Sequence, residues 1–256
     1  HKAVPILEAA VQVQPRLPWP WFGLARAAGA SEKGRSAWRA GLALNLPDND
    51  AAADWIVRAL DAGTEQAHWH AVIPERPDRL RDAAVVLARR GERTAAEAMF
   101  ERGIALDPAV GVAGARWMLR WGETERALVL LGPVQDRGCQ ALRVHGEALL
   151  AAERAAEAVS RLTEARALCP EDPRLDRTIG VARAIARDAA GVPLLVAWLE
   201  GHPEDLAARR TLLALLRAHG RWDEMADHLS ALDEAGVATD QERADLPRAR
   251  LGLPLR

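Results

Sequence analysis

Apolar residues recur along the chain at intervals of three and four residues, in stretches of about a dozen residues divided by short polar turns that contain glycine or proline. This spacing places the apolar side chains on one face of each stretch and predicts amphipathic helices. Alanine, leucine, arginine and glutamate dominate the composition, whereas β-branched residues are few. The pattern therefore predicts an all-α protein.

Residues 77–110 and 139–172 are two copies of one 34-residue pattern. Both copies have a large apolar residue at positions 4, 11 and 24, a small residue at 8, 20 and 27, and proline at 32. In the first copy these are Leu80, Leu87, Phe100, Ala84, Ala96, Gly103 and Pro108, and in the second Leu142, Leu149, Leu162, Gly146, Ala158, Ala165 and Pro170.

The pattern describes two amphipathic helices that pack antiparallel across a short turn. Small residues at positions 8 and 20 let the two backbones approach to about 8–10 Å. Proline at position 32 ends the second helix because it lacks the backbone N–H. Since one pair cannot bury its own apolar face, neighbouring pairs must stack.

Weaker copies begin at Pro173 and at Leu206, the first with its terminal proline, Pro203, one residue early. Residues 111–138 predict a degenerate pair with a short second helix, and 51–62 with 65–72 predict a pair in poor register. A short helix over 241–246 precedes a proline-containing tail. Residues 3–15 fit the second helix of a repeat, from which we expect the native protein to extend further N-terminally.

The pattern resembles the tetratricopeptide repeat family, whose 34-residue consensus reads W-x2-L-G-x2-Y, then A-x3-F, then P. The resemblance implies an α-solenoid of antiparallel helix pairs that forms a right-handed superhelix. It divides the chain into degenerate N-terminal helices (1–76), a repeat array (77–239), and a capping helix with its tail (240–256). In this family the first helix of each pair lines a concave groove, mainly through positions 2, 5, 9, 12 and 13.

Charge and cysteine content narrow the alternatives. The 34 basic and 36 acidic residues give a net charge of −2, which argues against a nucleic-acid or anionic-membrane binder, and no apolar run is long enough to span a bilayer. Cys139 and Cys169 belong to no CxxC pair, so a zinc site is not expected. At positions 1 and 31 of one repeat they are close enough for a disulfide, but we expect two reduced thiols.

No motif for catalysis or cofactor binding occurs in the sequence. Neither GxxxxGK[ST], GxGxxG, HExxH nor GxSxG is present. We therefore expect no enzymatic activity, no metal and no cofactor.

Arginine occupies position 5 in each of the four legible repeats, and position 12 or 13 in two of them. The six residues are Arg81, Arg89, Arg143, Arg177, Arg210 and Arg217. Guanidinium groups bind carboxylates bidentately, so this set predicts a groove for an acidic protein segment. The alternative is that these arginines pair with carboxylates of neighbouring helices, at little net gain.

Two functions follow from these observations. The first is a non-catalytic scaffold that binds another protein through the arginine-lined groove. The second is the repeat domain of a longer enzyme or envelope-assembly protein, because such arrays accompany glycosyltransferases, sulfotransferases and polysaccharide polymerase or export machinery. The composition is typical of a GC-rich bacterial genome; a cytoplasmic location is favoured over a periplasmic one, and the oligomeric state stays open.

Overall fold

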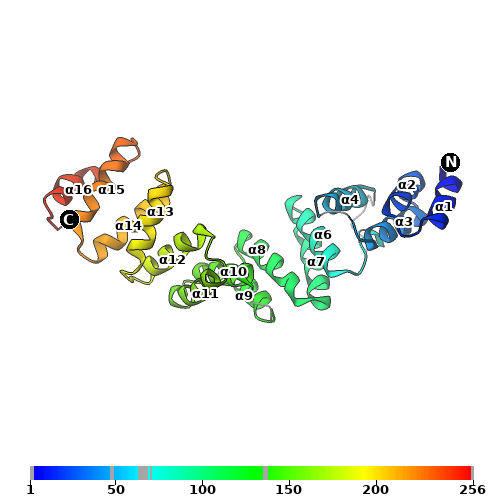
Figure 1. Cartoon of the computed structure of the whole chain (residues 1–256), viewed down its shortest axis with the longest axis horizontal. Coiled ribbons are helices and arrows are strands. Elements are labelled where there is room, and N and C mark those ends of the chain that lie inside the picture. Colours follow the sequence, from blue (N-terminus) through cyan, green and yellow to red (C-terminus); the bar gives the residue numbers. More distant parts are fainter. Residues whose placement is uncertain (1–2, 47–48, 63–68, 70, 135–137, 255–256) are drawn as a thin grey trace. The chain divides into compact units, whose positions relative to one another are not determined.

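A computed structural model describes residues 3–46, 49–62, 69, 71–134 and 138–254. These residues form fifteen α-helices and one short 3₁₀ helix, and no strand is found among them (Figure 1), as the sequence predicted. Residues 65–68 and 70, within the expected 65–72 helix, lie outside the described part of the chain.

The helices follow one another in short pairs. Their bounds are α1 (Ala3–Val13), α2 (Pro18–Ala28), α3 (Glu32–Ala43), α4 (Asn49–Ala62), α6 (Pro77–Arg89), α7 (Arg93–Leu106), η1 (Pro108–Val110), α8 (Gly111–Arg120), α9 (Thr124–Leu131), α10 (Cys139–Ala151), α11 (Ala155–Leu168), α12 (Pro173–Ile185), α13 (Gly191–Gly201), α14 (Leu206–Ala218), α15 (Trp222–Glu234) and α16 (Asp240–Arg250). Contacts between sequential helices dominate, notably α2 with α3, α6 with α7, α10 with α11, and α12 with α13.

The small residue at position 8 allows the two helices of a pair to approach closely. In α10 this residue is Gly146, and a Cβ atom placed there would lie 2.5 Å from Cγ of Leu162 in α11. In α12 it is Gly180, whose added Cβ would lie 2.8 Å from Cγ of Leu195 in α13. Both leucines are fully buried. The close approach inferred from the repeat pattern is therefore confirmed.

Position 15, in the turn between the paired helices, has a positive φ in all four legible repeats. Glycine fills it in two repeats, as Gly91 (φ 81°) and Gly220 (φ 69°). Glu153 (φ 60°) and Arg187 (φ 57°) fill it in the other two. Because a Cβ disfavours the left-handed region, the two non-glycine turns are strained relative to the glycine ones.

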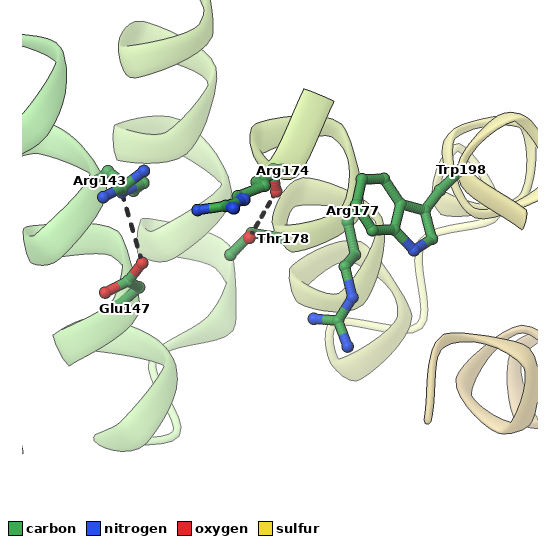
Figure 2. A pocket seen from close by; sticks show the side chains of 6 residues that line it. All are labelled: Arg143, Glu147, Arg174, Arg177, Thr178 and Trp198. Atoms are coloured by element: carbon green, nitrogen blue, oxygen red, sulfur yellow. Dashed lines mark hydrogen bonds and ion pairs between the residues drawn. The ribbon is translucent and has the colours of Figure 1, made fainter. Parts of the chain in front are cut away.

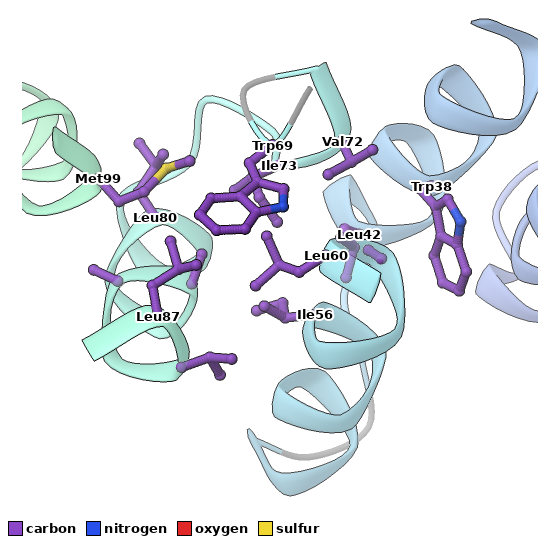
Figure 3. Packing of buried hydrophobic residues seen from close by; sticks show 14 of the residues in the cluster. Trp38, Leu42, Ile56, Leu60, Trp69, Val72, Ile73, Leu80, Leu87 and Met99 are labelled. Atoms are coloured by element: carbon purple, nitrogen blue, oxygen red, sulfur yellow. The ribbon is translucent and has the colours of Figure 1, made fainter. Parts of the chain in front are cut away.

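The chain divides into two compact units, each with its own core. Unit 1 comprises residues 1–121 and 129–135, and unit 2 comprises 122–128 and 136–256. Figure 3 shows part of the unit 1 core, where aromatic and aliphatic side chains of α3, α4, α6 and α7 meet. Phe22 stacks on Trp55 with ring centroids 4.2 Å apart, and Trp38 is almost fully buried beside them. These tryptophans fill space between helices.

Unit 2 has two apolar clusters among its described residues. One joins α10, α11 and α12 around Leu162, and the other joins α13, α14, α15 and α16 around Leu212 and Leu229. Helix α16 packs on α15 and continues to Arg250. The expected end at residue 246 is therefore too early, since the helix passes through Pro247.

Cys139 and Cys169 form a disulfide, with their Cα atoms 6.1 Å apart, so the expectation of two reduced thiols is wrong. Cys139 is the first residue of α10, and Cys169 directly follows α11. Antiparallel packing brings these two ends together. The bond therefore closes one complete helix pair into a covalent loop.

Candidate functional site

Two of the arginines predicted from the repeat pattern, Arg143 of α10 and Arg177 of α12, line a single cleft in unit 2 (Figure 2). The cleft has a volume of about 380 Å³ and lies between the first helices of two consecutive repeats. Its other lining residues are Glu147, Arg174, Thr178 and Trp198.

Arg143 links its own repeat to the next one. Its Nη1 lies 3.1 Å from Oδ2 of Asp172, and its Nε lies 3.6 Å from Oε1 of Glu147. Asp172 is the N-cap of α12, where its other carboxylate oxygen accepts a hydrogen bond from the backbone N–H of Arg174. One carboxylate thus caps the helix and holds the arginine of the preceding repeat.

Arg177 makes the corresponding link one repeat later. Its Nε lies 2.5 Å from Oδ2 of Asp205, and its Nη2 lies 3.3 Å from Oδ1. Asp205 is the N-cap of α14 and also accepts hydrogen bonds from the N–H of Ala208 and the indole of Trp198, each at 3.0 Å. These hydrogen bonds, of which the one from Arg177 has the largest effect, hold the pKa of Asp205 well below its ordinary value. Burial acts in the opposite direction and raises the pKa, but less strongly.

The remaining predicted arginines of unit 2 bind helix α16. Arg210 places its Nε 3.1 Å from Oε1 of Glu242 and donates from Nη2 to the carbonyl of Val237 at 2.9 Å. Arg217 lies 2.5 Å from the buried carboxylate of Asp245. Both arginines therefore fasten the last helix to α14, and neither lines the cleft.

In unit 1 the predicted arginines are not brought together at one site. Arg81 donates to its neighbour Asp82 at 2.8 and 2.9 Å and borders a smaller cleft of about 330 Å³ beside Asp107. Arg89 is exposed and has no ion pair among the described residues.

Glu147, Arg174, Thr178 and Trp198 are the cleft residues that sequence reasoning did not assign to a site. Arg174 stands at position 2 of its repeat, one of the groove positions of the resembled family, so its position was a usable signal. Its guanidinium is exposed and has no partner among the residues described. Trp198 comes from a second helix, so no groove position indicates it. One face of its ring stacks on His202, with centroids 3.6 Å apart.

The cleft offers a free guanidinium, the Thr178 hydroxyl and part of an indole ring, which suit binding of an anionic and partly apolar ligand. Within the described part of the chain, no group of three or more His, Cys, Asp or Glu residues is placed to hold a metal ion. The same residues include no helix both long and apolar enough to cross a bilayer.

The chain is similar to solved structures of tetratricopeptide repeat proteins. One is YrrB, described as having an unusual peptide-binding site, at 14% identity over 79% of this chain and 95% of that one, with a TM-score of 0.47. A second is TTC0263 of Thermus thermophilus, at 24% identity over 68% and 99%, with a TM-score of 0.44. A third is the repeat domain of P58(IPK), at 14% identity over 98% and 92%, with a TM-score of 0.34.

These likenesses concern the helical-repeat fold alone. No protein-family model and no curated protein matches the chain.

Proposed function

We propose that this chain is a non-catalytic interaction scaffold whose unit 2 cleft binds a carboxylate-bearing segment of a partner protein. The observation that carries the proposal is the gathering of Arg143, Arg174 and Arg177 from two consecutive repeats around one cleft beside Trp198. A guanidinium and an indole ring are the side chains most enriched at the energetic centres of protein interfaces.

The size and composition of the cleft also favour a peptide segment. A volume of about 380 Å³ accommodates two or three side chains of a partner but little more. Because the lining consists of charged and hydroxyl groups around one aromatic ring, an acid-bearing segment satisfies it better than a wholly apolar one.

The test is selection of a random decapeptide library displayed on phage against the immobilised chain. We expect enriched peptides to carry a carboxylate, and their synthetic versions to bind less tightly as salt increases. Arg174→Glu should weaken binding at least tenfold, since a charge-assisted contact contributes about 1.5–3 kcal/mol.

Arg161→Glu is the matched control, because Arg161 lies on α11 and does not line the cleft. Failure to enrich any sequence, or equal binding by the Arg174→Glu and unaltered chains, would overturn the proposal.

The second candidate function, as a repeat domain of an envelope-assembly protein, is favoured by the Cys139–Cys169 disulfide. Disulfides persist in oxidising compartments such as the periplasm and are rare in the cytosol. Alkylation of the protein in native cells followed by mass spectrometry tests this. Bridged cysteines support an envelope location, whereas two alkylated thiols contradict it.

A further inference from the structure

The charges of the cleft are balanced within the chain itself. Arg143 and Arg177 are held by Asp172 and Asp205, and the carboxylate of Glu147 lies beside Arg143. With Arg174 included, three guanidinium groups face three carboxylates. A segment with many acidic residues therefore meets no net positive charge, and each acid beyond the first is repelled by carboxylates already in place.

Arg174 is the exception within this balanced set. Two aspartates lie two residues from Arg174: Asp172 bonds the backbone N–H of Arg174 and the side chain of Arg143, and Asp176 pairs with Arg166. No described residue pairs with the Arg174 guanidinium. The Thr178 hydroxyl one turn further along α12 donates to the Arg174 carbonyl, so its oxygen still accepts a hydrogen bond. One position in the cleft is thus open to an anion.

Trp198 supplies the apolar part of the cleft. Its ring is held in place by the stacked His202 on one face and by the hydrogen bond from Nε1 to Asp205. An indole fixed by its surroundings loses little conformational entropy when a ligand packs against it. It therefore favours a large apolar side chain next to the bound acid.

We infer that the cleft recognises a segment with one acidic residue adjacent to one large apolar residue, and that Arg174 binds its carboxylate. This inference rests on the proposed function and makes it more specific. Arg143 and Arg177 are then positioning residues, which fix α12 and the start of α14 so that Arg174 and Trp198 face a common ligand.

The experiment uses three acetylated, amidated decapeptides that differ only at their central residues. The first carries one Glu beside Phe in an Ala-Gly-Ser background, the second carries Gln in place of that Glu, and the third carries four Glu and no Phe. We expect the first to bind the full chain at least tenfold more tightly than either of the others.

Arg174→Gln should abolish the difference between the Glu and Gln peptides without lowering the denaturant midpoint. Arg177→Gln should lower the midpoint, because it leaves the half-buried carboxylate of Asp205 without its main partner. This variant should still distinguish the Glu peptide from the Gln peptide. Arg161→Gln, with the same change of net charge, should leave binding unchanged and the midpoint nearly so, because its partly exposed ion pair with Glu164 contributes little stability.

The outcomes separate the two claims. The one-acid inference is overturned if the four-Glu peptide binds most tightly. It is also overturned if Arg177→Gln loses the difference between the Glu and Gln peptides while Arg174→Gln keeps it. Either result leaves the proposed function intact. Absence of binding by all three peptides, together with failed library selection, overturns the proposed function and this inference with it.

Discussion

Replacing Gly146 with alanine tests the close approach of α10 and α11. The added Cβ would lie 2.5 Å from Cγ and 2.7 Å from Cδ2 of Leu162, whereas carbon atoms in contact prefer about 3.5–4.0 Å. Leu162 is fully buried, so it cannot move aside into solvent. Overpacking of this kind costs about 1–3 kcal/mol, against a gain of about 1 kcal/mol in helix propensity. We expect a net loss of about 1 kcal/mol of unfolding free energy.

Chemical denaturation followed by circular dichroism measures this loss, with Gly201→Ala in α13 as the control. An added Cβ at Gly201 has nothing within 4 Å, so only helix propensity acts and this variant should be as stable as the unaltered chain or more stable. Combining Gly146→Ala with Leu162→Ala should cost less than the two changes separately, since the new methyl occupies vacated space. Refutation would come from a Gly146→Ala chain as stable as the Gly201→Ala chain.

Three further predictions concern turns, pH and redox state. Glu153→Gly and Arg187→Gly should each stabilise unit 2 by up to about 1 kcal/mol in denaturant titrations, because glycine relieves the positive φ; unchanged or lower midpoints would contradict the strain. The lowered pKa of Asp205 means that its stabilising effect is complete above the unfolded value of 3.8 and is lost as the pH falls below it, so Asp205→Asn should flatten the decline of stability in acid; an unchanged decline would count against this. Reducing the Cys139–Cys169 bond should lower the unfolding free energy by up to about 3–4 kcal/mol for a loop of this length, and a melting temperature indifferent to reductant would argue against a bridged native state.

Much of the fold was predictable because the repeat positions report packing directly. A small residue at position 8 and a leucine at position 24 specify that two helices meet, as Gly146 and Leu162 do. In the repeat that begins at Pro173 position 24 is Val196, but the residue that meets Gly180 is Leu195. Helix α13 is apolar over most of its length, so hydrophobic spacing alone does not determine which face it buries.

The candidate site was only half visible in the sequence. The position-5 arginines are evident in the sequence as a recurring set, but their partners are not. Asp172 and Asp205 lie 29 and 28 residues away and resemble ordinary N-caps. A bond between a position-5 arginine and the N-cap of the first helix of the next repeat has no local sequence pattern. Whether an arginine is held by a carboxylate of the chain or open to a ligand is decided by tertiary contacts.

The link from a position-5 arginine to the next cap aspartate makes two neighbouring repeats depend on one shared bond. The arginine and the aspartate of each link belong to different repeats. If a single repeat is moved into another array, its arginine lacks an aspartate to bond at one end, and at the other end an N-cap aspartate lacks its arginine. Insertion of a further copy of the repeat that carries Arg177 leaves the pairing intact, since the new arginine meets an equivalent cap aspartate. Unit 2 can therefore change length by duplication more easily than it can exchange repeats with an unrelated array.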